Sequence, residues 1–120
     1  MRQNISSGAK WEDIVGYSRA VRIGGYIWVA GTTAAGKTMY EQASNALGII
    51  EGALRQAGAS MRDVVRTRMF ITDISQWEEA GRAHGEYFRD VKPAATMVEV
   101  SKLIDPELWI EIEVDAFVAP

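Results

Sequence analysis

The stretch YSRAVRIGGYIWVAGT, residues 17–32, decides the fold of this chain. Two runs rich in β-branched and aromatic residues flank the pair Gly24-Gly25, and this arrangement predicts a β-hairpin closed by a tight turn. The strand that ends at Gly31 is therefore expected to run antiparallel to the strand before it. A fully parallel sheet with a helix after every strand is correspondingly disfavoured.

The residues that follow, GTTAAGKT at 31–38, match the phosphate-loop pattern G-x-x-x-x-G-K-[ST] letter for letter. In a true phosphate loop the backbone N–H groups surround a phosphate, the lysine neutralises charge and the hydroxyl holds Mg²⁺. Such enzymes need a mostly parallel sheet and usually a longer chain than these 120 residues. The hairpin and the length therefore argue against a nucleotide site.

Helical and extended patterns alternate along the rest of the chain. Apolar residues recur at helical spacing over 43–57, which predicts a first helix. Ser75 and Glu78 fit a capping box that starts a second helix, with an apolar stripe from Trp77 to Phe88. Trp11 falls in a loop flanked by glycine and serine. The predicted strands are QNIS (3–6), the two arms of the hairpin, VVRTRMFIT (64–72), ATMVEV (95–100) and LWIEIEVDAFV (108–118).

These elements predict one α+β domain over residues 1–120 in the order β-β-β-α-β-α-β-β, a mixed sheet of about six strands with two helices on one face. The other face should be polar if it meets water. YIWVA (26–30) and MFI (69–71) instead place apolar or aromatic side chains on both sides of the sheet. The simplest cover is another copy of the chain, so a homo-oligomer is expected, with small-molecule pockets at its seams.

The composition disfavours several classes of function. A formal net charge of −3 argues against a nucleic-acid partner, which requires a basic face. The chain has no cysteine and one histidine, so thiolate chemistry is excluded and neither a metal nor an organic cofactor is expected. No signal peptide or membrane-spanning apolar run is recognisable, so a cytoplasmic protein without a membrane partner is expected.

Five segments in this order, VGYSRAV, WVAG, DVVRTRMFITD, PAATMVEV and IEIE, resemble the RidA family, also called YjgF or L-PSP. The resemblance extends from Tyr17 to Phe117. It implies a chorismate-mutase-like fold and a homotrimer with small-molecule clefts between subunits. It also implies that GTTAAGKT is a strand end and a loop, so we interpret the phosphate-loop match as a coincidence and Lys37 as an ordinary loop lysine.

The better-studied members of this family hydrolyse reactive 2-imino acids and their enamine tautomers to 2-keto acids and ammonia. They hold the substrate carboxylate with an arginine that directly follows the Pro-Ala of the strand written here as PAATMVEV. That position is Ala95, and backbone groups of Ala95, Thr96 and Met97 are expected to bind substrate instead. Two other positions differ from those members. Serine is often found at the position of Ala30, and cysteine is found in some members at the position of Met97. A typical 2-imino acid is therefore not the expected substrate.

Three carboxylates alternate along IEIEVD, so Glu111, Glu113 and Asp115 are expected to share one face of a strand. One interpretation is a charged face paired with Arg66 and Arg68, which have the same spacing on their own strand. The resemblance places Glu111 at the acid that orients the hydrolytic water. Glu111 is therefore the candidate catalytic residue.

Four other side chains are candidates for substrate binding or structure. Tyr17 matches a tyrosine at the family's cleft. The alternative interpretation is an aromatic side chain that fills an interface between subunits. Arg19 shares the face of Tyr17, and Arg19 or Arg68 is a candidate replacement for the missing arginine. His84, the only histidine, is a candidate substrate-binding residue because imidazole titrates near neutrality. Its place on the apolar stripe of the second helix favours a packed, hydrogen-bonded core histidine instead.

The sequence therefore leads to one function and two alternatives. The first is a RidA-like trimer that hydrolyses a reactive imine or enamine lacking the usual carboxylate. The alternative is a non-catalytic trimer that binds small ligands or acts like a chaperone. The third, an endoribonuclease, is disfavoured by the acidic balance of the chain.

Overall fold

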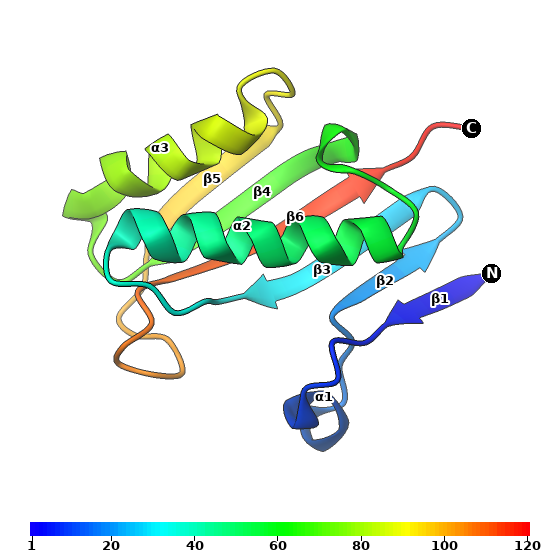
Figure 1. Ribbon diagram of the computed structural model, residues 1–120, viewed down its shortest axis with the longest axis horizontal. Coiled ribbons are helices and arrows are strands. Elements are labelled where there is room, and N and C mark those ends of the chain that lie inside the picture. The colour runs from blue at the N-terminus through cyan, green and yellow to red at the C-terminus, as the bar shows by residue number, and fades with distance from the viewer.

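Six strands form one mixed sheet in the order β1-β2-β3-β6-β4-β5. The computed structural model describes all residues from 1 to 120 (Figure 1). The strands are β1 (Arg2–Ile5), β2 (Ala20–Ile23), β3 (Tyr26–Thr32), β4 (Val64–Ile71), β5 (Ala94–Glu99) and β6 (Ile110–Phe117). Only β4 and β5 run parallel, and every other neighbouring pair is antiparallel. The predicted α+β class and the mixed sheet of about six strands are confirmed.

Three helices accompany the sheet: α1 (Lys10–Val15), α2 (Met39–Gln56) and α3 (Trp77–Phe88). α2 and α3 lie side by side across one face, as predicted, and α1 projects beyond the β1 edge (Figure 1). The prediction of a loop around Trp11 is therefore wrong, because Trp11 lies in α1. Glu12 of α1 is buried and accepts hydrogen bonds from the backbone N–H and the hydroxyl of Ser7, and these bonds hold the short helix in place.

The hairpin of β2 and β3 forms as predicted, with Ile23 opposite Tyr26 and Gly24 at φ 60 in the turn. Gly25 is required by its surroundings rather than by its backbone angles. A Cβ at this position would lie 2.5 Å from the carbonyl oxygen of Val118. The backbone N–H of Val118 donates to the Gly25 carbonyl at 2.8 Å, so the C-terminal segment packs directly against the turn.

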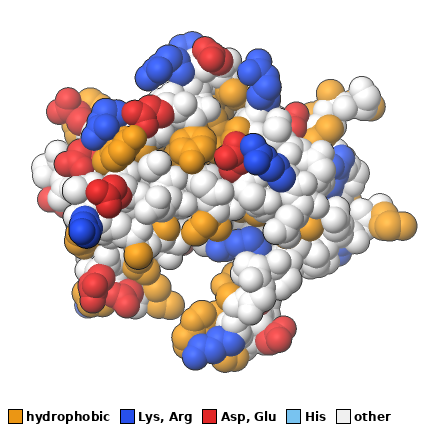
Figure 2. All heavy atoms as spheres, in the orientation of Figure 1, with side chains coloured by type: hydrophobic (Ala, Val, Ile, Leu, Met, Phe, Trp, Pro, Cys, Tyr) orange, Lys and Arg blue, Asp and Glu red, His pale blue; other side chains and the backbone are white.

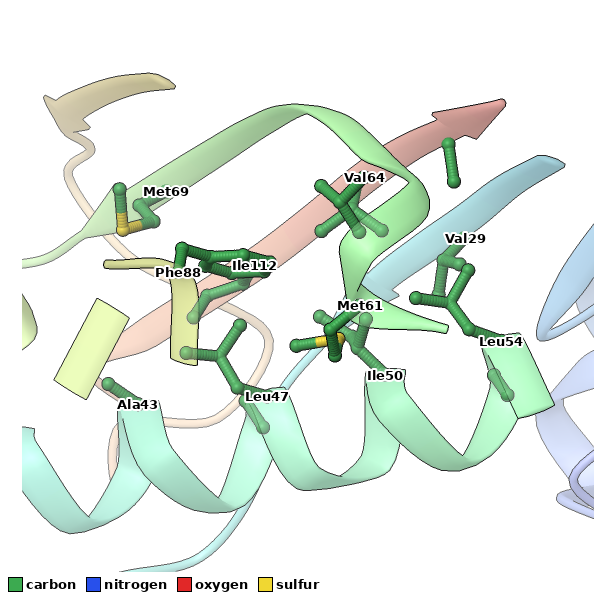
Figure 3. Close-up of a cluster of buried hydrophobic side chains, with 14 of the residues drawn as sticks. Val29, Ala43, Leu47, Ile50, Leu54, Met61, Val64, Met69, Phe88 and Ile112 are labelled. Atoms are coloured by element: carbon green, nitrogen blue, oxygen red, sulfur yellow. The ribbon is translucent and has the colours of Figure 1, made fainter. Parts of the chain in front are cut away.

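The core lies between α2, α3 and the face of the sheet that they cover (Figure 3). On β6, Ile110, Ile112 and Val114 are fully buried, since alternate residues of a strand point to the same face. Fully burying a side chain of this size stabilises the fold by about 1.5–3 kcal/mol. The predicted apolar stripe of α2 faces these residues and is buried: Ala43, Ala46, Leu47, Ile50, Ala53, Leu54.

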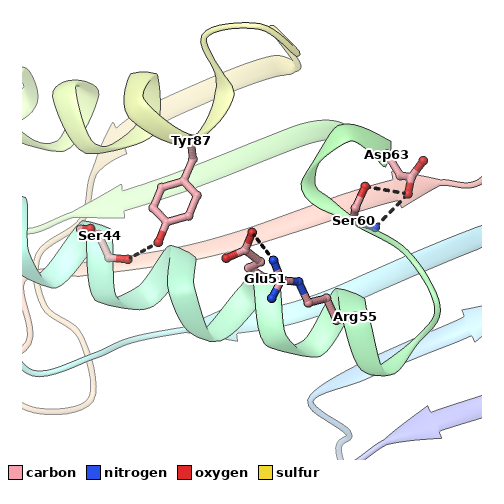
Figure 4. Close-up of polar contacts among 6 residues, drawn as sticks. All are labelled: Ser44, Glu51, Arg55, Ser60, Asp63 and Tyr87. Atoms are coloured by element: carbon pink, nitrogen blue, oxygen red, sulfur yellow. Dashed lines mark hydrogen bonds and ion pairs between the residues drawn. The ribbon is translucent and has the colours of Figure 1, made fainter.

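The start of α3 differs from the predicted capping box. Ser75 lies in a 3₁₀ turn, Ile74–Gln76, and its backbone N–H and hydroxyl donate to the Asp73 carboxylate at 3.0 and 2.6 Å. These bonds lower the pKa of Asp73 and make it the cap, so the helical segment begins earlier than expected. Trp77, expected on the buried stripe, is exposed. A capping box does form between Ser60 and Asp63, before β4 (Figure 4).

Gln42 is a buried polar side chain that positions the connection leading into β6. Its side-chain nitrogen donates to the carbonyl of Glu107 at 2.9 Å, and its side-chain oxygen accepts from the backbone N–H of Trp109 at 2.8 Å. Backbone groups that are not in a sheet ladder need other partners, and here the Gln42 amide supplies them.

The two faces of the molecule differ in their cover. Figure 2 shows the face that carries the helices, where charged side chains of both signs are spread among hydrophobic ones. α2 and α3 leave the opposite face, called the bare face below, without a helix. There the rings of Tyr26 and Trp28 stack at 5.9 Å, Tyr26 and Phe117 lie 4.9 Å apart, and all three are exposed. Neither α2 nor any other helix has the length and apolarity needed to cross a bilayer.

Candidate functional site

A row of carboxylates crosses the bare face along β6. Glu111, Glu113 and Asp115 alternate with buried residues and are each partly exposed, which confirms the shared face predicted from the sequence. In the ladder with β4, Arg66 lies opposite Asp115 and Arg68 lies opposite Glu113. Arg68 also forms an ion pair with Asp115, with Nη1 3.3 Å from the carboxylate. The predicted pairing of arginines with this row is therefore present at Asp115.

Glu111 differs from the other two carboxylates. Its partner in the ladder is Phe70 rather than an arginine, and it forms no ion pair within the chain. Its carboxylate lies over the backbone of Gly31, and a Cβ built on residue 31 would collide with Oε2 and lie 2.9 Å from the carboxyl carbon. Only glycine leaves Glu111 room in this place. The carboxylate is thus an acceptor without a charged partner, open to water or to a ligand.

Arg19 contacts Gly31, and Tyr17 lies beside Arg19. Arg19 donates from Nη2 to the Gly31 carbonyl oxygen at 2.8 Å, and its Cζ lies 5.9 Å from the ring centroid of Tyr17. Arg19 Nε is buried and has no hydrogen-bond partner. Tyr17 and Arg19 therefore lie together, but not through the predicted strand spacing, because β2 begins only at Ala20. We call Tyr17, Arg19, Gly31 and Glu111 the Gly31 cluster.

Sequence reasoning missed the role of Gly31. The ladder between β3 and β6 shifts register between Val29 and Thr32, and Gly31 lies within this bulge, beneath Glu111. The signal that could have revealed it is a glycine inside a strand pattern, which often marks a bulge or a close approach of two chain segments.

A groove of about 630 Å³ includes one member of the Gly31 cluster, Tyr17, whereas Arg19, Gly31 and Glu111 do not line it. It is lined by Tyr17, Trp28, Glu113 and Asp115, and by Glu12 from α1. The hydrogen bonds from Ser7 lower the pKa of the Glu12 carboxyl, so this wall of the groove stays negatively charged. The predicted cleft tyrosine therefore borders an acidic and aromatic surface.

β5 is an edge strand, and it carries the three residues predicted to bind substrate through their backbone: Ala95, Thr96 and Met97. In the ladder with β4, Ala95 lies beside Thr67, which is fully buried on the helix-covered side. Ala95 and Met97 therefore point to that side, and Thr96 points to the bare face. The outer backbone N–H and C=O groups of β5 have no strand partner and are available to a ligand or to another chain.

The predicted site residues thus form two groups on opposite faces of the sheet. Glu111 projects from the bare face, whereas the side chain of Ala95 projects from the helix-covered face. Arg68 also lies on the bare face and is engaged by Asp115, so it cannot replace an arginine at position 95 of its own chain. A pocket that includes both Glu111 and Ala95 requires a second chain.

His84 lies on α3 above β4. Its Nε2 is 2.8 Å from Thr67 Oγ1, and its ring centroid is 4.7 Å from that of Phe88. Burial lowers the pKa of the His84 imidazole below its ordinary value. These are the contacts of a packed, hydrogen-bonded histidine, the interpretation favoured by the apolar stripe of the helix. A role of His84 in substrate binding remains a prediction. We call Thr67, His84 and Ala95 the β5 cluster.

The phosphate-loop pattern does not form a phosphate cradle. Thr38 caps α2 by accepting from the backbone N–H of Glu41 at 3.1 Å. The backbone N–H of Lys37 donates to the Glu41 carboxylate at 3.1 Å, and that of Tyr40 donates to Glu79 at 3.2 Å. Carboxylates therefore occupy donors that would surround a phosphate, and their charge would repel one. Nor does the chain bring together three side chains able to hold a metal ion.

Comparison with known proteins identifies the family. Residues 8–118 match the sequence profile described as Endoribonuclease L-PSP. The chain belongs to the L-PSP family. The crystal structure of Rv2704 from Mycobacterium tuberculosis, a member of the YjgF/YER057c/UK114 family, superposes on this L-PSP chain with a TM-score of 0.97, at 52% identity over 98% of this chain and 100% of that one.

More distant relatives agree with this assignment. A protein of Streptomyces coelicolor is 34% identical and matches 96% of this L-PSP chain and 91% of its own length. A RutC family protein of Pyrococcus abyssi is 32% identical over 84% of this chain and 85% of its own length. The L-PSP assignment, which confirms the resemblance to RidA and YjgF, therefore rests on nearly the whole chain rather than on a single motif.

Proposed function

We propose that this L-PSP chain forms a homotrimer with small-molecule clefts between subunits and hydrolyses a reactive imine or enamine that is not a typical 2-imino acid. The observation that carries this proposal is the carboxylate of Glu111. It is the one member of the β6 row without an arginine opposite it, and it packs closely on Gly31, where only a glycine leaves it room.

Glu111 would act as the general base on water. The water oxygen bonds to the imine carbon while Glu111 accepts one water proton; the electron pair of the carbon–nitrogen double bond moves to nitrogen, which takes that proton from Glu111, and a neutral carbinolamine forms. Glu111 then accepts the proton of the carbinolamine hydroxyl and passes it to the nitrogen, so that the carbon–nitrogen bond breaks as the carbonyl group forms and ammonia leaves. One water is consumed for each ammonia released, and no oxidant or cofactor is needed.

Two features support an assembly in which neighbouring chains complete the cleft. The Gly31 cluster and the β5 cluster lie on opposite faces of one sheet, so a ligand can reach both only between two chains. The bare face also exposes the rings of Tyr26, Trp28 and Phe117, which favours its burial against another copy. The outer edge of β5 offers the neighbour unpaired backbone groups as well.

Ala95 determines which imines are excluded. A methyl group cannot grip a carboxylate, and the planar fork of an arginine is the usual group for that purpose. Arg19 is the remaining candidate for the task, because Nη2 is bonded to Gly31 while the guanidinium keeps further N–H donors. A crystal soaked with pyruvate tests this rescue, and a carboxylate bound without an arginine contact would eliminate it.

The hydrolase is tested by ammonia release from imines generated in the assay. Glu111→Gln should lower the rate about 100-fold or more, the usual contribution of a general base. Glu107→Gln is the control, because Glu107 is exposed, lies just before β6 and does not line the groove, and it should keep most of the rate. Equal ammonia release with and without the native protein would overturn the hydrolase.

A second candidate, favoured by the methyl group at position 95, is a trimer that binds small ligands without turning them over or acts like a chaperone. It predicts saturable binding of a carbonyl compound with no ammonia release in the same assay. An endoribonuclease, the activity in the family's description, is disfavoured by the net charge of −3, because RNA binding relies on neutralising phosphates.

A further inference from the structure

The hydroxyl of Thr67 sets the chemical state of His84. Thr67 is fully buried in β4, and the single partner of its Oγ1 is His84 Nε2 at 2.8 Å. If Nε2 carried the ring proton, it would donate to Oγ1 and the buried hydroxyl hydrogen would have no acceptor. If Nε2 is unprotonated, the hydroxyl donates to it and both atoms are satisfied. Since a buried unpaired donor costs about 1–3 kcal/mol, the second arrangement is favoured.

This arrangement places the ring proton of His84 on Nδ1. Nδ1 has no hydrogen-bond partner in the chain, and it is not among the buried polar atoms, so solvent reaches it. The same bond disfavours a doubly protonated ring, because Nε2 would again have to donate to Oγ1. His84 therefore presents a fixed, uncharged N–H donor at the surface, held by Thr67 beneath and by the ring of Phe88 beside it.

The His84 ring is bonded to Thr67, and the ladder neighbour of Thr67 is Ala95, whose methyl is exposed. Thr67 and Ala95 are direct neighbours in the β4–β5 ladder and point to the same face, about 4.8 Å apart across the strands. Figure 1 shows α3 on the side of the sheet where β4 and β5 lie. The arginines of β4 and Arg82 of α3 are directed elsewhere: Arg66 and Arg68 point to the other face, and Arg82 lies 3.8 Å from the ring centroid of Tyr40.

We propose that His84 is a ligand-binding residue whose Nδ1–H donates to a neutral acceptor, the carbonyl oxygen or imine nitrogen of an uncharged ligand seated against Ala95. This inference rests on the proposed cleft and names the class of its substrate. A neutral donor beside a methyl group suits an uncharged acceptor, whereas it offers a carboxylate no positive charge. Thr67 is the positioning residue that orients the ring.

The first test uses the fact that the chain has a single histidine. Long-range ¹H–¹⁵N spectra of protein labelled at histidine, recorded at about pH 7.5, report the state of His84 alone. The expected result is a neutral ring protonated at Nδ1, and Thr67→Val should remove this preference. A native ring protonated at Nε2, or doubly protonated, would overturn the proposal without any assumption about turnover.

The second test uses pyruvamide as an uncharged probe and pyruvate as its anionic counterpart. Pyruvamide should shift the Nδ1 resonance saturably, and pyruvate should bind at least about fivefold more weakly. His84→Phe should weaken pyruvamide about tenfold, the value of one hydrogen bond, whereas His84→Asn, which keeps a donor near the Nδ1 position, should restore most of the affinity. Ala95→Arg should reverse the preference between the two probes.

The outcomes separate this inference from the hydrolase. A shift of the His84 resonances by pyruvamide in a protein that releases no ammonia supports the ligand-binding residue and removes the hydrolase. If ammonia release depends on Glu111 and pyruvamide does not shift the His84 resonances, the hydrolase is supported and the ligand-binding role of His84 is overturned. Equal affinity of His84→Phe and the native chain for pyruvamide also overturns it.

Discussion

Gly31→Ala is expected to separate stability from activity. The backbone accepts alanine, because Gly31 is not among the residues with positive φ. The atoms nearest to the added methyl would all belong to the Glu111 side chain, with the carboxyl carbon at 2.9 Å and Cγ at 3.3 Å. This partly exposed side chain can rotate away at a cost of about 0.5–1.5 kcal/mol. The carboxylate then leaves its place over residue 31, and a displacement of about 1 Å can lower a rate about 100-fold.

Two measurements on this variant are decisive together. Urea denaturation should show a free energy of unfolding lowered by no more than about 1.5 kcal/mol, while ammonia release falls about 100-fold. Gly52→Ala is the control, because a Cβ in this position of α2 meets nothing within 4 Å and should add up to about 1 kcal/mol of stability at an unchanged rate. A crystal structure of Gly31→Ala should show Glu111 in a new rotamer. An unmoved Glu111, or a loss of stability above about 3 kcal/mol, would refute the close packing of residue 31 against Glu111.

Gln42→Leu should lower the free energy of unfolding in urea by about 2–4 kcal/mol, because the backbone N–H of Trp109 and the carbonyl of Glu107 lose their partner. Asn45→Ala, at an exposed position, should lower it by less than about 1 kcal/mol. Similar losses in the two variants would contradict the role given to the Gln42 hydrogen bonds. Because burial lowers the pKa of His84, the folded chain binds its proton less well than the unfolded chain, so stability should fall as the pH drops below about 6.5. The denaturation midpoint should fall between about pH 7.5 and about pH 5.5, and the fall should be larger in the native chain than in His84→Gln, which has no histidine to protonate. Trp28→Asp should convert the native oligomer to a monomer in sedimentation equilibrium, and a native chain that is already monomeric would contradict the assembly.

The fold could be predicted because its strongest signals are local. The glycine pair of the hairpin, the helical stripe over 43–57 and the alternation along β6 each report a backbone periodicity that needs no knowledge of distant residues. The errors lie where two local solutions compete. Asp73 and Ser75 both suit a helix start, and extended backbone at Asp73 decided between them. The short helix at Glu12 depends on a contact with Ser7 rather than on its own pattern.

The candidate site was predicted only in part. Periodicity placed Glu111 on one face with Glu113 and Asp115, and it suggested the arginine partner that Asp115 has. It did not show that Glu111 lacks such a partner, because strand register decides which β4 residue lies opposite. Nor did it link Thr67 to His84, since one residue comes from a strand and the other from a helix packed upon it.

The hairpin, the buried face of α2 and the acidic row along β6 were determined by the sequence itself, because they follow from residues a few positions apart. The tertiary structure alone decided that Gly31 lies under Glu111, that Ala95 faces away from it, and that Thr67 orients His84. These relations join segments far apart in the chain. They depend on a bulge, on strand order and on helix placement, which no local pattern encodes.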